Sequence, residues 1–259
     1  MRRRILSGLV ALVSVMAAVL DVGVPGSTAS PVLGPRLSRI AVTVALGDSV
    51  PYGTRCGCTP FPEQSAARVR ALTGRRVTTF NHSVSGYRSG DVLAQLRTDR
   101  TVIAHVRAAT VVEVMIGAND IAFSSRCGTS TACYRPALAA ANRNTAAIVA
   151  RIRAITAGRP VAIVLIGYWN AWLDGRYAAA RGSAYVATSR SLTRSQNAAI
   201  LAIARLTRSM YVDLWQAFRG SADVDDTALL AYDGDHPNRA GHARIAAAIT
   251  TALRAHLPT

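Results

Sequence analysis

The chain has 259 residues, 50% of them hydrophobic and 17% charged, and this length fits one α/β domain with a sizeable buried core. Its 30 basic residues, all of them arginine, outnumber the 14 acidic residues and give a net charge of +16. Because the arginines are scattered along the chain and form no cluster, we expect no nucleic-acid partner, although the charge favours adsorption to anionic cell-wall polymers or membrane surfaces.

Residues 1–29 have the composition of a secretory signal peptide. Three arginines at 2–4 precede an apolar stretch at 9–20, and small residues follow at 27–29. The apolar stretch is shorter than the roughly 20 residues that a membrane-spanning helix needs. We therefore expect a secreted protein that begins near residue 30 and carries 27 minus 13, or +14, charges. An uncleaved membrane anchor is the alternative.

The rest of the chain alternates short apolar runs, rich in β-branched residues, with segments of helical period. The predicted strands cover residues 40–46, 77–80, 110–116, 161–166 and 210–214. The predicted helices cover residues 62–72, 89–99 with a further turn to 107, 134–156, 187–207 and 238–257. This alternation is typical of a parallel sheet with helices on both faces. We expect residues 30–259 to form a single domain of this kind.

Polar residues follow each predicted strand. The strand ends read GDSVPYG, NHSVSGY, GANDIAF and GYWNAWLDG, and a long loop after the fifth strand reaches YDGDHPN. In open parallel sheets, ligands bind outside the carboxyl ends of the strands. The sequence therefore places its chemically capable residues at one edge of the sheet.

Ser49 is the candidate nucleophile, because it stands at the tip of the first predicted strand. A serine hydroxyl is a weak nucleophile until a base within hydrogen-bond reach removes its proton. His236 is the candidate base, since Pro237 favours an extended backbone at the histidine. Asp233 lies three residues earlier and can accept the Nδ1 proton of the ring, which leaves Nε2 free to face the serine. Asp235 is expected to point elsewhere.

Attack on an ester creates a negative oxygen that needs hydrogen-bond donors. The sequence offers three donors, the backbone N–H groups of Ser49 and Gly86 and the carboxamide of Asn119. The remaining histidines are interpreted as packing or surface residues; they are His82, His105, His242 and His256.

Four of these segments, in their order along the chain, resemble the four sequence blocks of the SGNH (GDSL-type) hydrolase family. They are GDSV at 47–50, SVSGY at 83–87, GAND at 117–120 and DGDHPNRAGH at 233–242. The resemblance extends over residues 40–257 and is closest to exported actinobacterial members. Val50 stands where the family name has leucine, and no G-x-S-x-G elbow of the α/β-hydrolases is present.

The resemblance implies a flavodoxin-like three-layer α/β/α sandwich with a five-stranded parallel sheet. It also implies hydrolysis of carboxylic esters or thioesters without a metal or other cofactor. Ser49, His236 and Asp233 correspond to the catalytic triad of the family. Gly86 and Asn119, with the N–H of Ser49, correspond to its oxyanion hole.

Several aromatic residues at or just past the strand ends are candidate substrate-binding residues, with cover of the sheet edge as the alternative role. They are Tyr52, Tyr87, Tyr168, Trp169 and Trp172. The sequence lacks an evident lid helix or long apolar surface stretch, which favours short to medium acyl esters of small molecules or polymers. A carbohydrate O-acetylesterase and a lysophospholipase or lipase would use the same catalytic residues, and a non-catalytic cell-wall-binding module is the remaining alternative.

Four cysteines in an exported chain indicate disulfides, and three pairings are open. We favour Cys127 with Cys133, which bracket the loop GTSTA, and then Cys56 with Cys58 by default. A zinc site is the alternative, but the pairs lack C-x-x-C spacing.

An acidic segment around the candidate base offers a Ca²⁺ site as a further alternative, although its spacing matches no EF-hand pattern. Its members are Asp223, Asp225, Asp226, Asp233 and Asp235. We expect no metal and a monomeric protein.

Overall fold

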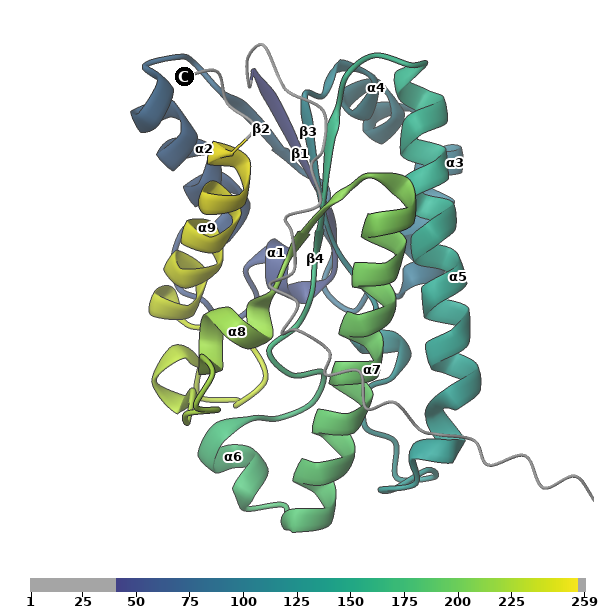
Figure 1. Cartoon of the computed structure of the whole chain (residues 1–259), viewed down its shortest axis with the longest axis vertical. Helices are drawn as coiled ribbons and strands as arrows, with labels where there is room; N and C mark the ends of the chain where they lie inside the picture. The colour runs from purple at the N-terminus through teal and green to yellow at the C-terminus, as the bar shows by residue number, and fades with distance from the viewer. Residues whose placement is uncertain (1–40, 256–259) are drawn as a thin grey trace, which may run out of the picture. The chain divides into compact units, whose positions relative to one another are not determined.

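The computed structural model describes residues 41–255 (Figure 1), so the predicted signal peptide and the last residues of the predicted final helix lie outside the described part. Five parallel strands form one sheet in the order β2-β1-β3-β4-β5. They are β1 (Val42–Gly47), β2 (Thr78–Asn81), β3 (Val111–Met115), β4 (Ala162–Ile166) and β5 (Met210–Val212). This order confirms the predicted flavodoxin-like sheet. The chain adds β2 on one side of β1 and β3 to β5 on the other, so the strand order reverses between β1 and β3, where such sheets bind their ligands.

Helices cover both faces of the sheet (Figure 1). One face carries α2 (Phe61–Thr73), α8 (Leu214–Arg219) and α9 (Arg239–Arg254). The other carries α3 (Ser89–Thr98), α4 (Arg100–Ala108), α5 (Thr131–Thr156) and α7 (Ser183–Thr207). Short helices at the carboxyl edge are α1 (Ser49–Tyr52), α6 (Gly175–Ala179) and the 3-10 turns η1 (Ala118–Asp120) and η2 (Thr227–Leu229). The three-layer prediction is confirmed.

The central strands are apolar on both faces because both faces are covered. Every residue of β3 and β4 is buried, and two separate apolar clusters fill the spaces between the sheet and the two helix layers. Glu113, in the middle of β3, is the polar exception. The hydroxyl of Ser65 donates to its Oε1 at 2.8 Å, and burial raises the pKa of Glu113 to about 8, so this carboxyl is protonated at neutral pH.

The helix boundaries differ from the sequence predictions in several places, among them the start of α5, which lies at Thr131 and not at residue 134. Asp99 separates α3 from α4, because its carboxylate accepts the N–H groups of Thr101 and Val102 and starts a new helix. Helix α7 begins at Ser183 and not at residue 187. The short helices α1, α6 and α8 were not predicted, since each is too short to show a helical period. None of the helices in the described part of the chain is long and apolar enough to span a membrane.

Candidate active site

Ser49 lies just past the carboxyl end of β1 and is the first residue of α1. Asp48 caps this helix, because its Oδ1 accepts the N–H of Val50 at 3.0 Å. Gly47 lets the turn approach β3 closely, since a Cβ at this position would lie 2.2 Å from the backbone oxygen of Met115. No hydrogen bond joins the N–H of Ser49 to another residue between 41 and 255, so this donor is available to a ligand.

His236 lies in a tight turn that its own neighbours close. Oδ2 of Asp233 lies 2.8 Å from Nδ1 of His236, and Oδ1 accepts the backbone N–H groups of Asp235 and His236, each at 3.1 Å. Partial burial raises the pKa of Asp233, but these hydrogen bonds to His236 and Asp235 outweigh it and leave the pKa below its ordinary value. An ionised Asp233 therefore keeps the proton of the ring on Nδ1 and leaves Nε2 as the acceptor.

One cavity of about 50 Å³ brings three of the candidate residues together. Ser49 from the end of β1, Asn119 from η1 after β3, and His236 from the loop after α8 all line it. The carboxyl edge of the sheet thus assembles residues that are widely separated in the sequence, as the motif positions predicted.

The two other candidate donors differ in their surroundings. Gly86 is exposed, has a φ of 85°, and sits in a turn closed by the N–H of Tyr87 donating to the oxygen of Val84 at 3.1 Å. The N–H of Gly86 bonds to no other described residue. Nδ2 of Asn119 donates to the backbone oxygen of Tyr87 at 2.9 Å, which ties the second block to the third. A carboxamide has two N–H groups, so the second remains for a ligand.

Asp48 forms the acidic floor beneath Ser49. It is 1% exposed, and its Oδ2 accepts the hydroxyl proton of Tyr168. Burial raises the pKa of Asp48 to about 6, against the opposing effect of the hydrogen bonds from Tyr168 and Val50. Asp48, the residue before Ser49, therefore titrates near pH 6 and is mostly ionised at neutral pH.

The predicted aromatic residues occupy two different environments. Tyr52 is 55% exposed and Tyr87 is half-buried, so their rings can meet a substrate. Tyr168 and Trp169 are each 1% exposed, and Trp169 stacks on Phe218 with ring centroids 4.5 Å apart. Both residues line the cavity, and their burial fits the alternative role that the sequence left open, cover of the sheet edge. The burial of the two rings stabilises the fold, and their position at a strand end does not by itself indicate whether they are buried.

Asp235 differs from its predicted orientation. It lines the same cavity as Ser49 and His236, and its Oδ2 lies 4.0 Å from Nδ1 of the histidine. Burial raises the pKa of Asp235, the charge of His236 opposes this, and Asp233 adds to it. The tight turn at Gly234, whose φ is 73°, brings both neighbouring carboxylates to the same side.

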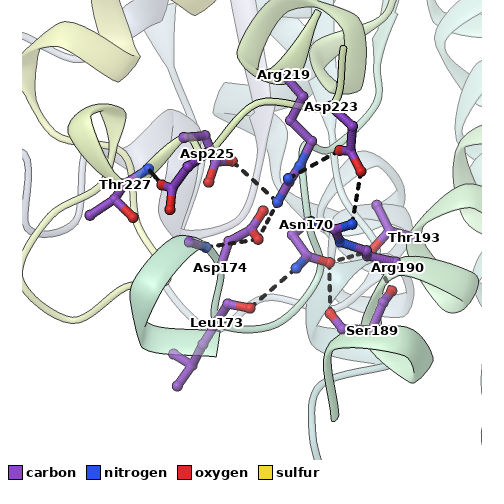
Figure 2. A network of polar contacts seen from close by, with 12 residues as sticks. Asn170, Leu173, Asp174, Ser189, Arg190, Thr193, Arg219, Asp223, Asp225 and Thr227 are labelled. Carbon is purple, nitrogen blue, oxygen red and sulfur yellow. Dashed lines mark hydrogen bonds and ion pairs between the residues drawn. The ribbon is translucent and has the colours of Figure 1, made fainter. Parts of the chain in front are cut away.

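Sequence reasoning missed polar side chains that hydrogen-bond to residues lining the cavity or lying next to it. Oδ1 of Asn170 accepts hydrogen bonds from the hydroxyls of Ser189 at 2.6 Å and Thr193 at 2.8 Å (Figure 2), and Asn170 lines the cavity. Asp120 accepts the N–H and hydroxyl of Ser89 at 2.9 and 2.6 Å, which joins η1 to the start of α3. The polar positions on the buried face of α7, four residues apart, were the signal that could have indicated such contacts.

The other described histidines take no part in the cavity. Nε2 of His82 lies 2.8 Å from Nδ1 of His105, beside the ring of Phe80. His242 is fully buried, accepts the N–H of Phe61 at 3.2 Å, and has a pKa that burial lowers to about 4. His256 lies outside the described residues.

The cysteines pair as favoured, Cys56 with Cys58 and Cys127 with Cys133, with Cα atoms 5.1 and 5.6 Å apart. Within residues 41–255, one group of three potential metal ligands comes together, Cys56 and Cys58 with His242. Because both sulfurs are joined in a disulfide, they do not offer the thiolates that zinc requires.

The five acidic residues considered as a Ca²⁺ site lie in three separate environments. Asp233 and Asp235 flank the ring of His236, and Asp223 and Asp226 surround a buried arginine. Asp225 accepts the N–H of Thr227 at 2.7 Å. Their carboxylates do not converge on a point where one cation could be held.

The chain matches the profile of a family described as GDSL-like Lipase/Acylhydrolase over residues 45–244. Among solved structures, it resembles a lipase from a goat rumen metagenome at 17% identity and a TM-score of 0.66, covering 82% of this chain and 97% of the other. The acetylxylan esterase of Geobacillus stearothermophilus shares 20% identity with a TM-score of 0.61, over 84% and 96% of the two chains. An α/β hydrolase from the metagenome of Lake Arreo, Spain, shares 21% identity with a TM-score of 0.60, over 85% and 97%. No curated protein matches the chain.

Proposed function

Since this chain belongs to the GDSL-like lipase/acylhydrolase family, whose members hydrolyse esters, we propose that it is a serine esterase that works through an acyl-enzyme intermediate. One observation supports this most strongly. Ser49, Asn119 and His236 line a single cavity, while Asp233 lies at hydrogen-bond distance from the far nitrogen of the histidine. These are the groups that nucleophilic catalysis by a serine requires.

In the proposed reaction, Nε2 of His236 takes the proton from Oγ of Ser49, and Oγ bonds to the carbonyl carbon of the ester. The tetrahedral intermediate then breaks its bond to the alcohol oxygen, which takes the proton from His236 as it leaves. Water attacks the acyl-enzyme with the same proton transfers and releases the acid. Asp233 stays ionised throughout, because its pKa lies below the ordinary value.

The proposed oxyanion donors are the N–H groups of Ser49 and Gly86 and the carboxamide of Asn119. The two backbone donors have no partner among the described residues, and Ser49 is the first residue of α1, where a backbone N–H has no acceptor within the helix. Each such donor contributes on the order of a hundredfold or more to the rate of acyl transfer.

The size of the cavity supports a short acyl group. Its volume of about 50 Å³ is small beside the roughly 300–1,000 Å³ of pockets that enclose drug-sized ligands, so the part next to Ser49 and His236 fits a small group better than a long chain. We therefore favour acetyl and similar short esters over the longer substrates of a lipase. A carbohydrate O-acetylesterase is the second candidate, since the open aromatic side chain of Tyr52 and the carboxylate of Asp235 could contact a sugar.

We also propose that the mature enzyme acts outside the cell as a monomer, after removal of residues 1–29. Its positive charge would hold it near anionic cell-wall polymers or membrane surfaces, where polymer-linked esters are accessible. Mass determination of the protein recovered from a culture medium checks the cleavage, and light scattering checks the oligomeric state.

The first experiment is hydrolysis of p-nitrophenyl esters from acetate to palmitate by the mature protein. Ser49→Ala should lose at least about 10⁴-fold in kcat/KM. Ser191→Ala, an exposed serine on α7, serves as the matched control and should leave kcat/KM unchanged. We expect the wild-type rate to be greatest for acetate and to fall with chain length.

An active Ser49→Ala variant would overturn the assignment of the nucleophile. A maximum at palmitate would instead overturn the short-acyl proposal while leaving the catalytic residues in place.

A further inference from the structure

Arg219, the last residue of α8, is a buried cation close to the proposed active site. It is 1% exposed and makes ion pairs with Asp174, with Asp226 at 3.6 Å and with Asp223 at 3.2 Å. Figure 2 shows the carboxylates of Asp174 and Asp223 beside its guanidinium. Removing charges from water costs several kcal/mol per ion, so such a cluster contributes little net stability and invites another explanation.

The segment that carries Asp174 contacts one side of the histidine turn. The backbone N–H of Asp174 donates to the oxygen of Gly234 at 2.9 Å, within the Asp233–His236 turn. The Asp174 side chain caps α6 by accepting the N–H of Gly175 at 2.8 Å. On α6, the ring of Tyr177 packs so closely that a Cβ on Gly234 would lie 2.4 Å from it.

The segment that carries Asp226 contacts the other side of the same turn. After η2, Leu230 pairs with Pro237 in an antiparallel bridge, and the N–H of Ala231 donates to the oxygen of His236 at 2.7 Å. The N–H of Asn238 donates to the oxygen of Leu229 at 2.9 Å. The two segments therefore hold the histidine turn between them.

We propose that Arg219, Asp174 and Asp226 form a positioning cluster for His236: one buried guanidinium joins the two segments that hold the histidine turn, and so directs the ring toward Ser49. These residues touch no substrate and act through the turn. The inference rests on the proposed function only in its assignment of His236 as the base.

The charges of the cluster support this role. Burial disfavours the charged form of Arg219, but Asp174, Asp226 and Asp223 outweigh it and raise the pKa of the guanidinium. Burial and the neighbouring Asp174 raise the pKa of Asp226, and Arg219 opposes this rise, so without Arg219 the Asp174 and Asp226 carboxyl groups would lose the cation that joins their two segments. Asp223 differs, because its side chain is 33% exposed and also pairs with Arg190 at 2.8 Å.

Four variants separate positioning from stability: Arg219→Met, Arg219→Lys, Arg219→Met combined with Asp226→Asn, and the control Asp223→Asn. The measurements are kcat and KM for p-nitrophenyl acetate well below the melting temperature, per active site titrated with a fluorophosphonate. Arg219→Met should lower kcat by tenfold or more with KM changed less than twofold. Arg219→Lys should recover part of this loss, and Asp223→Asn should stay within twofold of the wild type.

The double variant decides between the two roles, since it removes one of the unpaired carboxylates and should regain melting temperature over Arg219→Met. A positioning cluster predicts that its kcat remains low. Recovery of kcat together with melting temperature would overturn the proposal, and so would a wild-type kcat in every variant. If Arg219→Met does not fold, the double variant still allows the test, because it lacks one of the two unpaired carboxylates.

A readout that needs no turnover separates this proposal from the proposed function. The Nδ1 proton of His236, assigned with His236→Gln, should give a low-field NMR signal through its hydrogen bond to Asp233. We expect the signal to be lost in the double variant and retained in Asp223→Asn. An unchanged signal in the double variant overturns the positioning role, whereas a wild-type protein that hydrolyses no ester overturns only the proposed function.

Discussion

Ser49 is held by its own strand and by the two residues before it, whereas the turn of His236 also depends on the segment of Asp174, which is remote in the sequence. Gly47 and Asp48 fix the nucleophile through a close approach to β3 and a helix cap. The turn of His236 depends on backbone hydrogen bonds to residues that Arg219 connects. The comparison teaches that local sequence can specify one half of a catalytic pair, while the other half requires the completed fold.

Asp233→Asn should have the largest effect, because it removes the carboxylate that lies within hydrogen-bond distance of the ring of His236. The amide would favour the wrong ring tautomer, and we expect kcat to fall about 10³- to 10⁴-fold with the melting temperature within a few degrees of the wild type. Steady-state kinetics and a thermal melt check this. A loss of less than tenfold would mean that the turn orients His236 without its carboxylate.

Two glycine variants compare the supports directly. Gly47→Ala places a Cβ 2.2 Å from a backbone oxygen of β3 and should cost about 3 kcal/mol of unfolding free energy. Gly234→Ala meets Cβ and Cγ of Tyr177, which move only with α6, and a φ of 73°, so it should cost about 2–3 kcal/mol and lower kcat more than its stability loss explains. Urea unfolding with parallel kinetics measures both. If the two variants lost the same amount of kcat for each kcal/mol of unfolding free energy, the two turns would not differ in how they support catalysis.

Asp48→Asn should alter the pH dependence of stability. The pKa of Asp48 rises from 3.8 to about 6 on folding, so the folded state binds the proton more tightly. Its stabilising contribution is complete below pH 4 and is lost as the pH rises through 6, a change of about 3 kcal/mol. We expect the variant to gain stability relative to the wild type between pH 4 and 7 in urea unfolding. A constant difference between the two proteins would show that Asp48 titrates normally.

Asp235→Asn should have the smallest effect, because the residue lines the cavity without bonding the ring of His236. For the neutral p-nitrophenyl acetate we expect kcat/KM within about threefold of the wild type. For an aryl acetate that carries a carboxylate, kcat/KM should rise about fivefold, since one negative charge has left the cavity. Identical responses for the two substrates would indicate that the carboxylate of Asp235 faces away from the bound ester.

The sequence was sufficient for the sheet because its central strands are buried on both faces, and continuous apolar runs reveal such strands. The strand ends in turn located Ser49, Asn119 and His236, which the fold gathers around one cavity. The pairing of Asp233 with His236 was also predictable, since three residues in a turn suffice to bring them together.

The parts that sequence reasoning missed depend on partners distant along the chain. Asn170 meets hydroxyls of α7, and Arg219 meets Asp174, so neither contact leaves a local pattern. Tyr168 and Trp169 looked like exposed strand-end residues because nothing near them specifies Asp48 and Phe218 as neighbours. The roles of the candidate catalytic residues stay predictions until the variants are measured.

The order of the contacts along the chain has a consequence for biosynthesis. A nascent chain that has emerged as far as residue 230 contains Ser49, Gly86 and Asn119 but lacks the proposed base and its carboxylate. The turn closes only when Asn238 reaches Leu229, just before α9 begins. With the proposed roles, a chain without residues 233–238 lacks the base and its carboxylate, so ester hydrolysis would begin only after nearly the whole chain has been made.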